Sequence, residues 1–558
     1  MNYTYKIFII GCLFLIGFSC EDLDRFPTDQ PTSATFYSTE PELILAVNAC
    51  YRDITREDSR YILESLYDMT TDIAFNRGGY SGYQAVARGE GNSFTGAFSE
   101  VWDRQYRGIN KCNTLLDNMS KAQEVTDPDV FARINAEARF LRAWYYHRLV
   151  ELYGDVPLIT TVLPVGEEFV SKDPKTEIVD FILDELLEVA DDLPVSYAGA
   201  NVGRATFGAA HSLRARIALY NERWQDAIES AELVINGGAY SLFPNYRNLF
   251  TYAGENSSEV IFDYQFLDGF SMHGTPRNNQ SRMGGGFSQQ VPTQVLVDSY
   301  ECIDGLPIDE SPLYDPADPF SNRDPRLDAS IVLPATEWAG YIFETHRDST
   351  TTLNLNTNTI VQNQDVTNPF ASFTGYVWKK YLDDIDLTNL ERSSINWILI
   401  RYAEVLLTYA EAKIEANQID QSVLDALNEV RARAYGVSIG DTGLYPAVTT
   451  TDQNELRTYV RRERKVELAY EGFRLFDIRR WRIAEDVMNG PLYGRPARDY
   501  SVMGIPVIDE NASPDLSAYG SVLRVVEQRE FDPARDYLWA LPQNDLNVND
   551  NLTQNPEY

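Results

Sequence analysis

The stretch Val460-Arg-Arg-Glu-Arg-Lys-Val-Glu-Leu-Ala-Tyr-Glu-Gly-Phe-Arg-Leu-Phe-Asp-Ile-Arg-Arg-Trp481 is the densest pattern of charged and apolar residues in the chain. Four of its charged residues lie at offsets of three and four and would share one face of a helix: Arg464, Glu467, Glu471 and Arg474. Apolar neighbours would supply a packing stripe: Val466, Tyr470 and Phe473. Gly472 interrupts the pattern, where glycine costs about 1 kcal/mol relative to alanine and marks a close approach of another backbone segment. Because the charge pattern is also typical of a solvated surface helix, the rest of the sequence has to decide the fold.

Further stretches accompany this block in a fixed order along the chain: Ala136-Glu-Ala-Arg-Phe-Leu-Arg-Ala-Trp-Tyr-Tyr146, Leu152-Tyr-Gly-Asp-Val-Pro-Leu158, Trp397-Ile-Leu-Ile-Arg-Tyr-Ala-Glu-Val-Leu-Leu-Thr-Tyr-Ala-Glu-Ala412, Leu541-Pro-Gln-Asn-Asp545 and Asn551-Leu-Thr-Gln-Asn-Pro-Glu-Tyr558. Together they resemble the SusD/RagB family of nutrient-binding outer-membrane lipoproteins of Bacteroidetes-type bacteria. The resemblance covers nearly the whole chain. It implies a mainly α-helical, SusD-like fold, in which tetratricopeptide-like helix pairs form the scaffold and a long irregular region of loops and short strands forms the ligand face.

The N-terminus has the features of an export signal. Lys6 precedes an apolar run over residues 7–18, which is shorter than the roughly 20 residues of a membrane span. A serine then precedes Cys20, as lipoprotein processing requires. We therefore expect residues 1–19 to be the signal peptide and Cys20 to carry the lipid. Cys12 is a rival lipidation position, and plain secretion is the alternative.

Composition excludes some classes of protein. The formal net charge is −35, from 83 acidic and 48 basic residues, which disfavours a nucleic-acid partner because such binding neutralises phosphates. Beyond the two N-terminal cysteines, Cys50, Cys112 and Cys302 are odd in number and widely spaced, so neither a disulfide framework nor a zinc site is expected. The 34 tyrosines suit a carbohydrate-binding surface.

Helical periodicity occurs in three tracts of the chain. The predicted helices are Glu42–Tyr51, Phe98–Met119, Pro128–Tyr153, Lys175–Leu193, the hairpin Arg204–Tyr220 with Trp224–Asn236, the hairpin Ile398–Asn417 with Ser422–Tyr435, and Asn454–Trp481. In the first hairpin, small and aromatic residues fall at tetratricopeptide-like positions: Ala215, Trp224, Ala227 and Ala231.

An irregular segment, residues 242–396, separates the two hairpins. Pro, Gly, Asn and Asp recur in it, and short strand-like runs lie at Val260–Phe266 and Tyr376–Tyr381. Irregular segments this long are usually functional. We expect an N-terminal helical half, residues 20–236, and a C-terminal half, residues 237–558, that fold as one body.

No catalytic or metal-binding constellation stands out. The four histidines form no HExxH or HxH motif, and His147 and His211 lie in helical patterns that favour a structural role. Met283-Gly-Gly-Gly-Phe-Ser288 lacks the lysine of a phosphate-binding loop and is expected to pass near the ligand face. Asp545-Leu-Asn-Val-Asn549 begins like an EF-hand loop but lacks its glycine and final glutamate. We therefore expect no enzyme activity, no metal and no cofactor, although 83 acidic residues leave a glycosidase pair of carboxylates open.

Two loops combine aromatic rings with hydrogen-bonding groups, as glycan sites do. The first is the segment 72–94 and the second is Trp338-Ala-Gly-Tyr341. The resemblance places ligand contacts in these regions by position, not residue by residue. The predicted stacking residues are Tyr80, Tyr83, Trp338 and Tyr341, and the predicted polar partners are Asn76, Arg77 and Arg88. Ordinary packing is the alternative for each ring, and it is the interpretation we give to Trp102, Trp144 and Trp224.

The resemblance implies a lipoprotein anchored in the outer membrane and facing the cell exterior. It would bind an oligosaccharide or polysaccharide without catalysis and deliver it to a SusC-like TonB-dependent transporter. Three alternatives stay open: a peptide cargo as in RagB-like members, a surface glycosidase, and a scaffold that binds only the transporter. In each case the block at 460–481 is expected to stabilise the fold and not to bind the ligand.

Overall fold

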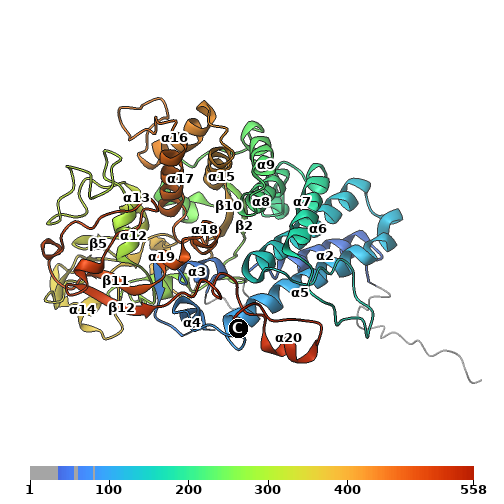
Figure 1. The fold of residues 1–558 in the computed structure, drawn as a ribbon, viewed down its shortest axis with the longest axis horizontal. Coiled ribbons are helices and arrows are strands. Elements are labelled where there is room, and N and C mark those ends of the chain that lie inside the picture. Colours follow the sequence, from blue (N-terminus) through green and yellow to red (C-terminus); the bar gives the residue numbers. More distant parts are fainter. Residues whose placement is uncertain (1–35, 56–60, 80–81) are drawn as a thin grey trace, which may run out of the picture.

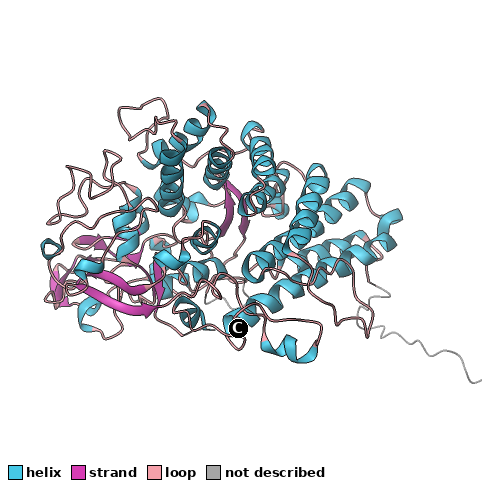
Figure 2. Cartoon of the chain, in the orientation of Figure 1, coloured by secondary structure: helices cyan, strands magenta, loops and turns pink. Residues whose placement is uncertain are grey.

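The computed structural model describes residues 36–55, 61–79 and 82–558. The predicted lipidation site Cys20 and the predicted stacking residue Tyr80 lie outside these ranges. Helices gather on one side of the molecule, and short strands and long loops gather on the other (Figures 1 and 2). No helix within the described ranges is long and apolar enough to cross a membrane.

The helical side is a row of neighbouring helices. Contacts run from α5 to α6, α7, α8, α9, α15 and α16 in turn, and α17 packs on α15. The bounds are α2 (Glu40–Tyr51), α5 (Gly96–Asn118), α6 (Pro128–Tyr153), α7 (Lys175–Val189), α8 (Phe207–Tyr220), α9 (Trp224–Asn236), α15 (Tyr402–Glu415), α16 (Gln421–Ala434), α17 (Gln453–Glu467) and α18 (Arg474–Arg480). The pairs α8–α9 and α15–α16 are the expected tetratricopeptide-like hairpins, so the mainly helical prediction is confirmed.

Local sequence explains where these helices begin and end. Asp127 caps α6, because its Oδ1 accepts hydrogen bonds from the backbone N–H groups of Asp129 (3.0 Å) and Val130 (3.3 Å). Pro128 occupies the first helical position, where a missing N–H costs nothing. Gly154 ends the helix at a positive φ of 75°.

Short helices and strands build the opposite side. The helices are α3 (Leu63–Asp68), α4 (Tyr83–Ala87), α10 (Tyr246–Leu249), α11 (Thr275–Asn279), α12 (Gln294–Ser299), α13 (Arg326–Ser330), α14 (Gln364–Thr367) and α19 (Ala484–Val487). The short helix α20 (Gln543–Val548) lies instead near α5 (Figure 1). The strands form antiparallel sheets: β1 (Ala74–Asn76) with β3 (Gln290–Pro292), β2 (Val260–Tyr264) with β10 (Trp397–Arg401), β4 (Ile331–Val332) with β9 (Val377–Trp378), β11 (Gly490–Pro496) with β12 (Leu523–Arg529), and β5 (Thr336–Trp338), β6 (Tyr341–Phe343), β7 (Thr351–Asn354) and β8 (Thr359–Gln362) in that order.

One large core joins both halves of the chain. It contains buried residues from Leu43 to Leu541, among them Trp144, Tyr145 and Trp397. Cys50, Cys112 and Cys302 are buried and free. His147 and His211 are also buried, and burial lowers the pKa of His211 to about 4.

The structure corrects two helix predictions. Ile398–Arg401 belongs to strand β10, in which all five residues are buried, and not to the helix that follows. The block at 460–481 is not one helix, because α17 ends at Glu467 and the chain turns before α18. Tyr470 and Gly472 have positive φ values of 66° and 87° in this turn. A Cβ on Gly472 would lie 2.9 Å from the Cα of Glu64, so the expected close approach of another backbone segment is confirmed.

The charged residues of this block are buried and are not a solvated ladder. Glu467 accepts hydrogen bonds from Arg401 Nη1 at 2.6 Å, from Arg326 Nη1 at 3.0 Å and from Arg433 Nη2. Glu471 binds Arg401 Nε and Lys380 Nζ, both at 2.6 Å. We refer to Glu259, Arg326, Lys380, Arg401, Arg433, Glu467 and Glu471 as the buried charge cluster. It ties β10, α13, α16 and α17 together, which is the structural role that the sequence predicted.

Candidate functional site

The end of strand β1 places two of the predicted polar residues. Asn76 is buried, and its Oδ1 accepts hydrogen bonds from the Gly78 N–H (3.0 Å) and from Gln289 Nε2 (3.3 Å). Arg77 follows at the surface, where its Nη2 donates to the Phe287 carbonyl oxygen at 2.8 Å. Phe287 lies in the glycine-rich loop 283–288, so this loop passes directly beside Arg77.

Arg77 lies against two aromatic rings that sequence reasoning missed. Its guanidinium carbon is 5.1 Å from the ring centroid of Phe370 and 5.7 Å from that of Phe373. Phe370 is 56% exposed and Phe373 is 38% exposed, while Phe75 stacks beneath Phe373 with ring centroids 6.0 Å apart. Two half-exposed rings beside a guanidinium offer flat apolar surface and hydrogen-bond donors in one place.

Trp338 and Tyr341 face each other across the β5–β6 hairpin. The two residues between them, Ala339 and Gly340, have φ values of 50° and 81°, as the tight hairpin turn requires. The indole Nε1 of Trp338 donates to Gln280 Oε1, and one side of the ring packs on a small apolar cluster that contains Phe75. The apolar cluster that contains Phe75 therefore supports both Trp338 and Phe373.

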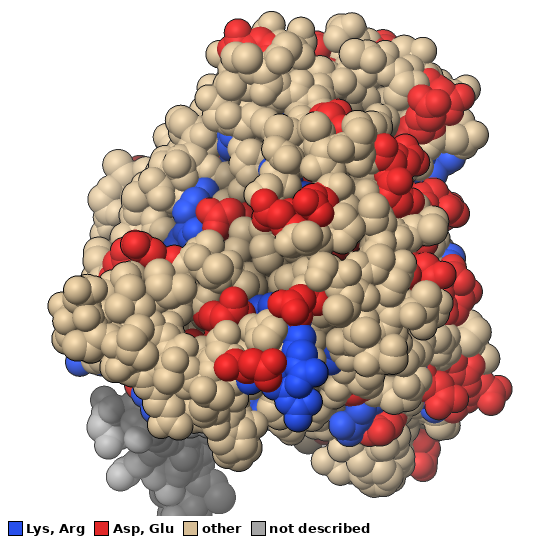
Figure 3. Space-filling model, turned by 90° about the vertical axis from the view of Figure 1, so that its left-hand side faces the viewer, with Lys and Arg blue, Asp and Glu red and all other residues tan. Residues whose placement is uncertain are grey.

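We call Arg77, Arg282, Phe370, Phe373 and Trp338 the arginine–aromatic face. Arg282 joins it because its Nε donates to the Phe370 carbonyl oxygen at 2.9 Å. Burial lowers the pKa of Arg77, and the neighbouring charge of Arg282 lowers it further. The face belongs to the left-hand side of Figure 1, where β5 and α14 are labelled; that side faces the viewer in Figure 3, where a few basic side chains lie low on the surface with acidic side chains beside them.

A cavity of about 530 Å³ adjoins the face at Phe373. Its lining includes Arg347, Asp365, Asn368 and Arg524. Burial raises the pKa of Asp365 to about 6, against the opposing hydrogen bond that its Oδ1 accepts from the Arg282 N–H at 2.6 Å. Burial lowers the pKa of Arg524 to about 10, and the nearby charge of Arg495 acts in the same direction. A volume of this size suits a small ligand or part of a longer chain.

The remaining predicted residues lie elsewhere. Tyr83 is fully buried, with its ring edge-on to Trp539 at 6.5 Å between centroids, so the prediction that it stacks on a ligand is wrong. Arg88 forms an ion pair with Glu90 at 2.6 Å on the surface beside α4, and its role stays a prediction. Trp102 and Trp144 are buried, as expected.

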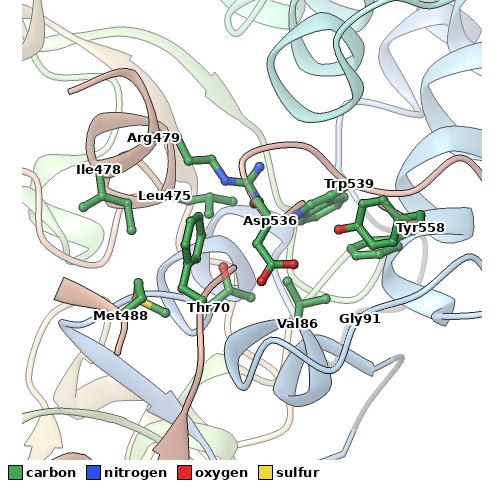
Figure 4. Close-up of a pocket in the computed structure, with 12 residues that line it drawn as sticks. Thr70, Val86, Gly91, Leu475, Ile478, Arg479, Met488, Asp536, Trp539 and Tyr558 are labelled. Carbon is green, nitrogen blue, oxygen red and sulfur yellow. The ribbon is translucent and has the colours of Figure 1, made fainter. Parts of the chain in front are cut away.

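Two other cavities differ in kind. Figure 4 shows Arg479, Asp536, Trp539 and Tyr558 around a space of only about 20 Å³, enough for a water molecule but not for a sugar. A groove of about 560 Å³ lies beside Trp102, Tyr106 and Phe169 on the helical side. It is the size of a ligand site, but its charged lining residues are acidic: Asp103, Glu168 and Asp545.

Comparison with known proteins identifies the family. The model of the SusD family matches residues 258–558, more than half of the chain, and a model described as "Starch-binding associating with outer membrane" matches residues 27–219. The chain belongs to the SusD family.

Relatives of known structure or sequence agree with this assignment. SusD-like protein P2 of Formosa agariphila is 27% identical over 99% of both chains. A SusD-like carbohydrate-binding protein from Bacteroides fragilis is 29% identical, with a TM-score of 0.80 over 93% of this chain and all of that one. The starch-binding protein SusD of Bacteroides thetaiotaomicron is 34% identical, over 27% of each chain.

Proposed function

We propose that this protein is a non-catalytic glycan-capture lipoprotein of the outer membrane, anchored through Cys20 and facing the cell exterior. It binds an oligosaccharide or polysaccharide and delivers it to a SusC-like TonB-dependent transporter. The observation that supports this proposal most is the arginine–aromatic face, where Phe370 and Phe373 lie against the Arg77 guanidinium. Arg282 bonds the Phe370 carbonyl oxygen, and Trp338 packs on the apolar cluster that contains Phe75. Membership in the SusD family supports the same conclusion.

The face suits capture because sugars have apolar C–H surfaces and hydroxyl edges. Half-exposed rings stack on the former, and guanidinium and amide groups bond the latter. The rings are held in place before any ligand arrives, Phe373 by Phe75 and Trp338 by its hydrogen bond to Gln280. Preorganised rings lose little conformational entropy on binding.

Binding of the purified protein to a panel of polysaccharides tests the proposal. We expect Phe373→Ala and Trp338→Ala to weaken binding of the recognised glycan at least tenfold, with the fold retained. Phe169→Ala is the matched control, since Phe169 is a half-exposed ring beside the acidic groove on the helical side. Loss of binding in Phe169→Ala alone would move the site to that groove. Retention of peptides instead of glycans would favour the peptide-uptake alternative.

Labelling cells that produce the protein with a radioactive fatty acid tests whether Cys20 carries the lipid anchor. Wild type should incorporate the label, and Cys20→Ala should not. Co-purification with an outer-membrane barrel from the same cells tests the transporter partner.

A further inference from the structure

The arginines of the proposed ligand site and of the cavity beside it lack carboxylate partners in the part of the chain that the structure describes. The chain has a formal net charge of −35, and many of its buried arginines pair with carboxylates, as Arg401 does with Glu467 and Glu471. Others, such as buried Arg323, donate to backbone carbonyl oxygens instead. Within the described residues, Arg77, Arg282, Arg347 and Arg524 form no ion pair with a carboxylate within 4 Å. Four arginines without a carboxylate partner among the described residues therefore lie near one another, on a protein that carries an excess of acid.

The hydrogen bonds of these arginines do not replace a carboxylate. Arg77 donates to the Phe287 carbonyl oxygen (2.8 Å) and Arg282 to the Phe370 carbonyl oxygen (2.9 Å). Arg524 donates to the Thr345 and Ser372 carbonyl oxygens. Neutral carbonyls orient the guanidinium groups, and the nearby carboxylates of Asp365 and Glu344 offset the desolvation of Arg282 and Arg524 only in part. Arg77 is half-buried and its Nε has no hydrogen-bond partner, although a partly desolvated cation is costly when unpaired.

The adjoining cavity carries a second pair of cations. Arg347 is exposed and Arg524 is largely buried, and both line the cavity together with Phe373. Asp365 is the only carboxylate among the lining residues, and its Oδ1 already binds the Arg282 N–H at 2.6 Å. The cavity therefore has a net positive lining, in contrast to the acidic groove beside Trp102.

We propose that the ligand of this site is an anionic glycan. Its carboxylate or sulfate ester groups bind Arg77 with Arg282, and Arg347 with Arg524, while sugar rings stack on Phe370, Phe373 and Trp338. This inference rests on the proposed function of glycan capture. Guanidinium groups pair with carboxylate and sulfate through two parallel N–H···O bonds, which neutral hydroxyls cannot match. Phe373 lies against Arg77 and also lines the cavity with Arg347 and Arg524, so its ring adjoins both arginine pairs.

Binding measured by titration calorimetry at one fixed salt concentration tests the inference with three probes. Polygalacturonate supplies carboxylates, carrageenan supplies sulfate esters, and laminarin is neutral. We expect at least one anionic probe to bind tenfold or more tightly than laminarin. The stronger of the two anionic probes identifies which anion the site recognises.

Arginine variants locate the effect. Arg77→Gln and Arg347→Gln should each weaken the anionic probe about five- to tenfold. Arg347→Gln should leave any laminarin binding within twofold, and Arg77→Gln should weaken laminarin by a smaller factor than the anionic probe, because only hydroxyl contacts are lost. Arg223→Gln is the matched control, because Arg223 is an exposed arginine paired with Asp180 on the helical side, and it should bind like wild type. Because the overall charge of the protein repels polyanions, non-specific attraction does not mimic this pattern.

Two results would overturn the inference, and they differ from each other. If laminarin binds as tightly as both anionic probes and the arginine variants do not change this, the site recognises neutral sugar and only the inference fails. If none of the three probes binds, the proposed glycan capture fails with it. Unfolding midpoints of the variants confirm that each remains folded during these measurements.

Discussion

Glu467→Gln tests whether the block at 460–481 stabilises the fold. In the native protein, Glu467 Oε1 accepts hydrogen bonds from Arg401 (2.6 Å) and Arg433, and Oε2 accepts one from Arg326 (3.0 Å). A glutamine has one carbonyl oxygen. If that oxygen keeps the first two donors, the amide N–H₂ group must face the Arg326 guanidinium, donor against donor.

The substitution therefore removes one charge-assisted hydrogen bond and leaves buried arginines short of one negative charge. Breaking a buried ion pair from one side costs about 3–5 kcal/mol, and the fully buried position of Glu467 places the expected loss in that range. The matched control is Asp180→Asn, which removes an exposed partner of Arg223 (3.0 Å) and should cost less than about 1 kcal/mol.

The pH dependence gives a second readout. Burial opposes the ionisation of Glu467, but the positive charges of its three arginine partners outweigh burial and hold its pKa well below the usual range. A carboxyl with a lowered native pKa contributes stability that is complete above its unfolded pKa of about 4.3 and is lost as the pH falls. Glu467→Gln should therefore lose more stability at pH 7 than at pH 3.

Guanidinium denaturation followed by tryptophan fluorescence measures the free energy of unfolding, and glycan titration of the folded variant measures affinity. We expect stability to fall and affinity to stay within twofold of wild type. A Glu467→Gln protein as stable as Asp180→Asn, or one that is stable but no longer binds glycan, would refute the structural role.

Three further predictions concern other parts of the molecule. Gly472→Ala should lower the free energy of unfolding by at least about 2 kcal/mol, because the φ of Gly472 is 87° and a Cβ would lie 2.9 Å from the Glu64 backbone. Denaturant midpoints measure this loss, and Gly440→Ala is the control because a Cβ on Gly440 would meet no other atom of the described residues within 4 Å. Burial raises the pKa of Asp68 to about 7 despite hydrogen bonds from the backbone N–H groups of Gly472 and Arg474, so the native state binds its proton more tightly than the unfolded state. Stability should therefore fall by about 2 kcal/mol between pH 5 and 7, and Asp68→Asn should remove that slope; equal slopes in both proteins would contradict the argument. Trp338→Phe removes the hydrogen bond to Gln280 but keeps an aromatic ring, so glycan affinity should fall only about two- to fivefold, less than in Trp338→Ala. Equal losses of affinity in the two variants would show that ring stacking does not contribute to binding.

Helical periodicity predicted most of the scaffold because those helices bury one face each. Pro128–Tyr153 and Trp224–Asn236 agree with the structure at both ends. The prediction that residues 460–481 form one helix is wrong because the charged residues at i, i+4 spacing pair with residues from other segments and not with each other. The turn at Tyr470 and Gly472 depends on the Glu64 backbone, which no local pattern reveals.

The candidate site was predictable only in part. Arg77 and Trp338 were found because an aromatic or a cation stands out in a short polar loop. Phe370 and Phe373 lie in Asn368-Pro-Phe-Ala-Ser-Phe373, which has the same mixture, but their contact with Arg77 spans almost 300 residues of sequence. Tyr83 looked equivalent to Trp338 in sequence, and only the tertiary packing against Trp539 separates them.

The contacts of the turn after α17 bear on how the protein reaches its native state. Arg474 binds Asp72 through two bonds of 2.8 Å, and Gly472 N–H binds Asp68 at 3.0 Å, across more than 400 residues. The N-terminus is synthesised first, so Asp68 and Asp72 lack these hydrogen-bond partners until almost the entire polypeptide has been made. Contacts of such long range slow folding. A nascent or truncated chain that ends before residue 472 should stay sensitive to proteases and dependent on chaperones, because the protein should fold only when its chain is nearly complete.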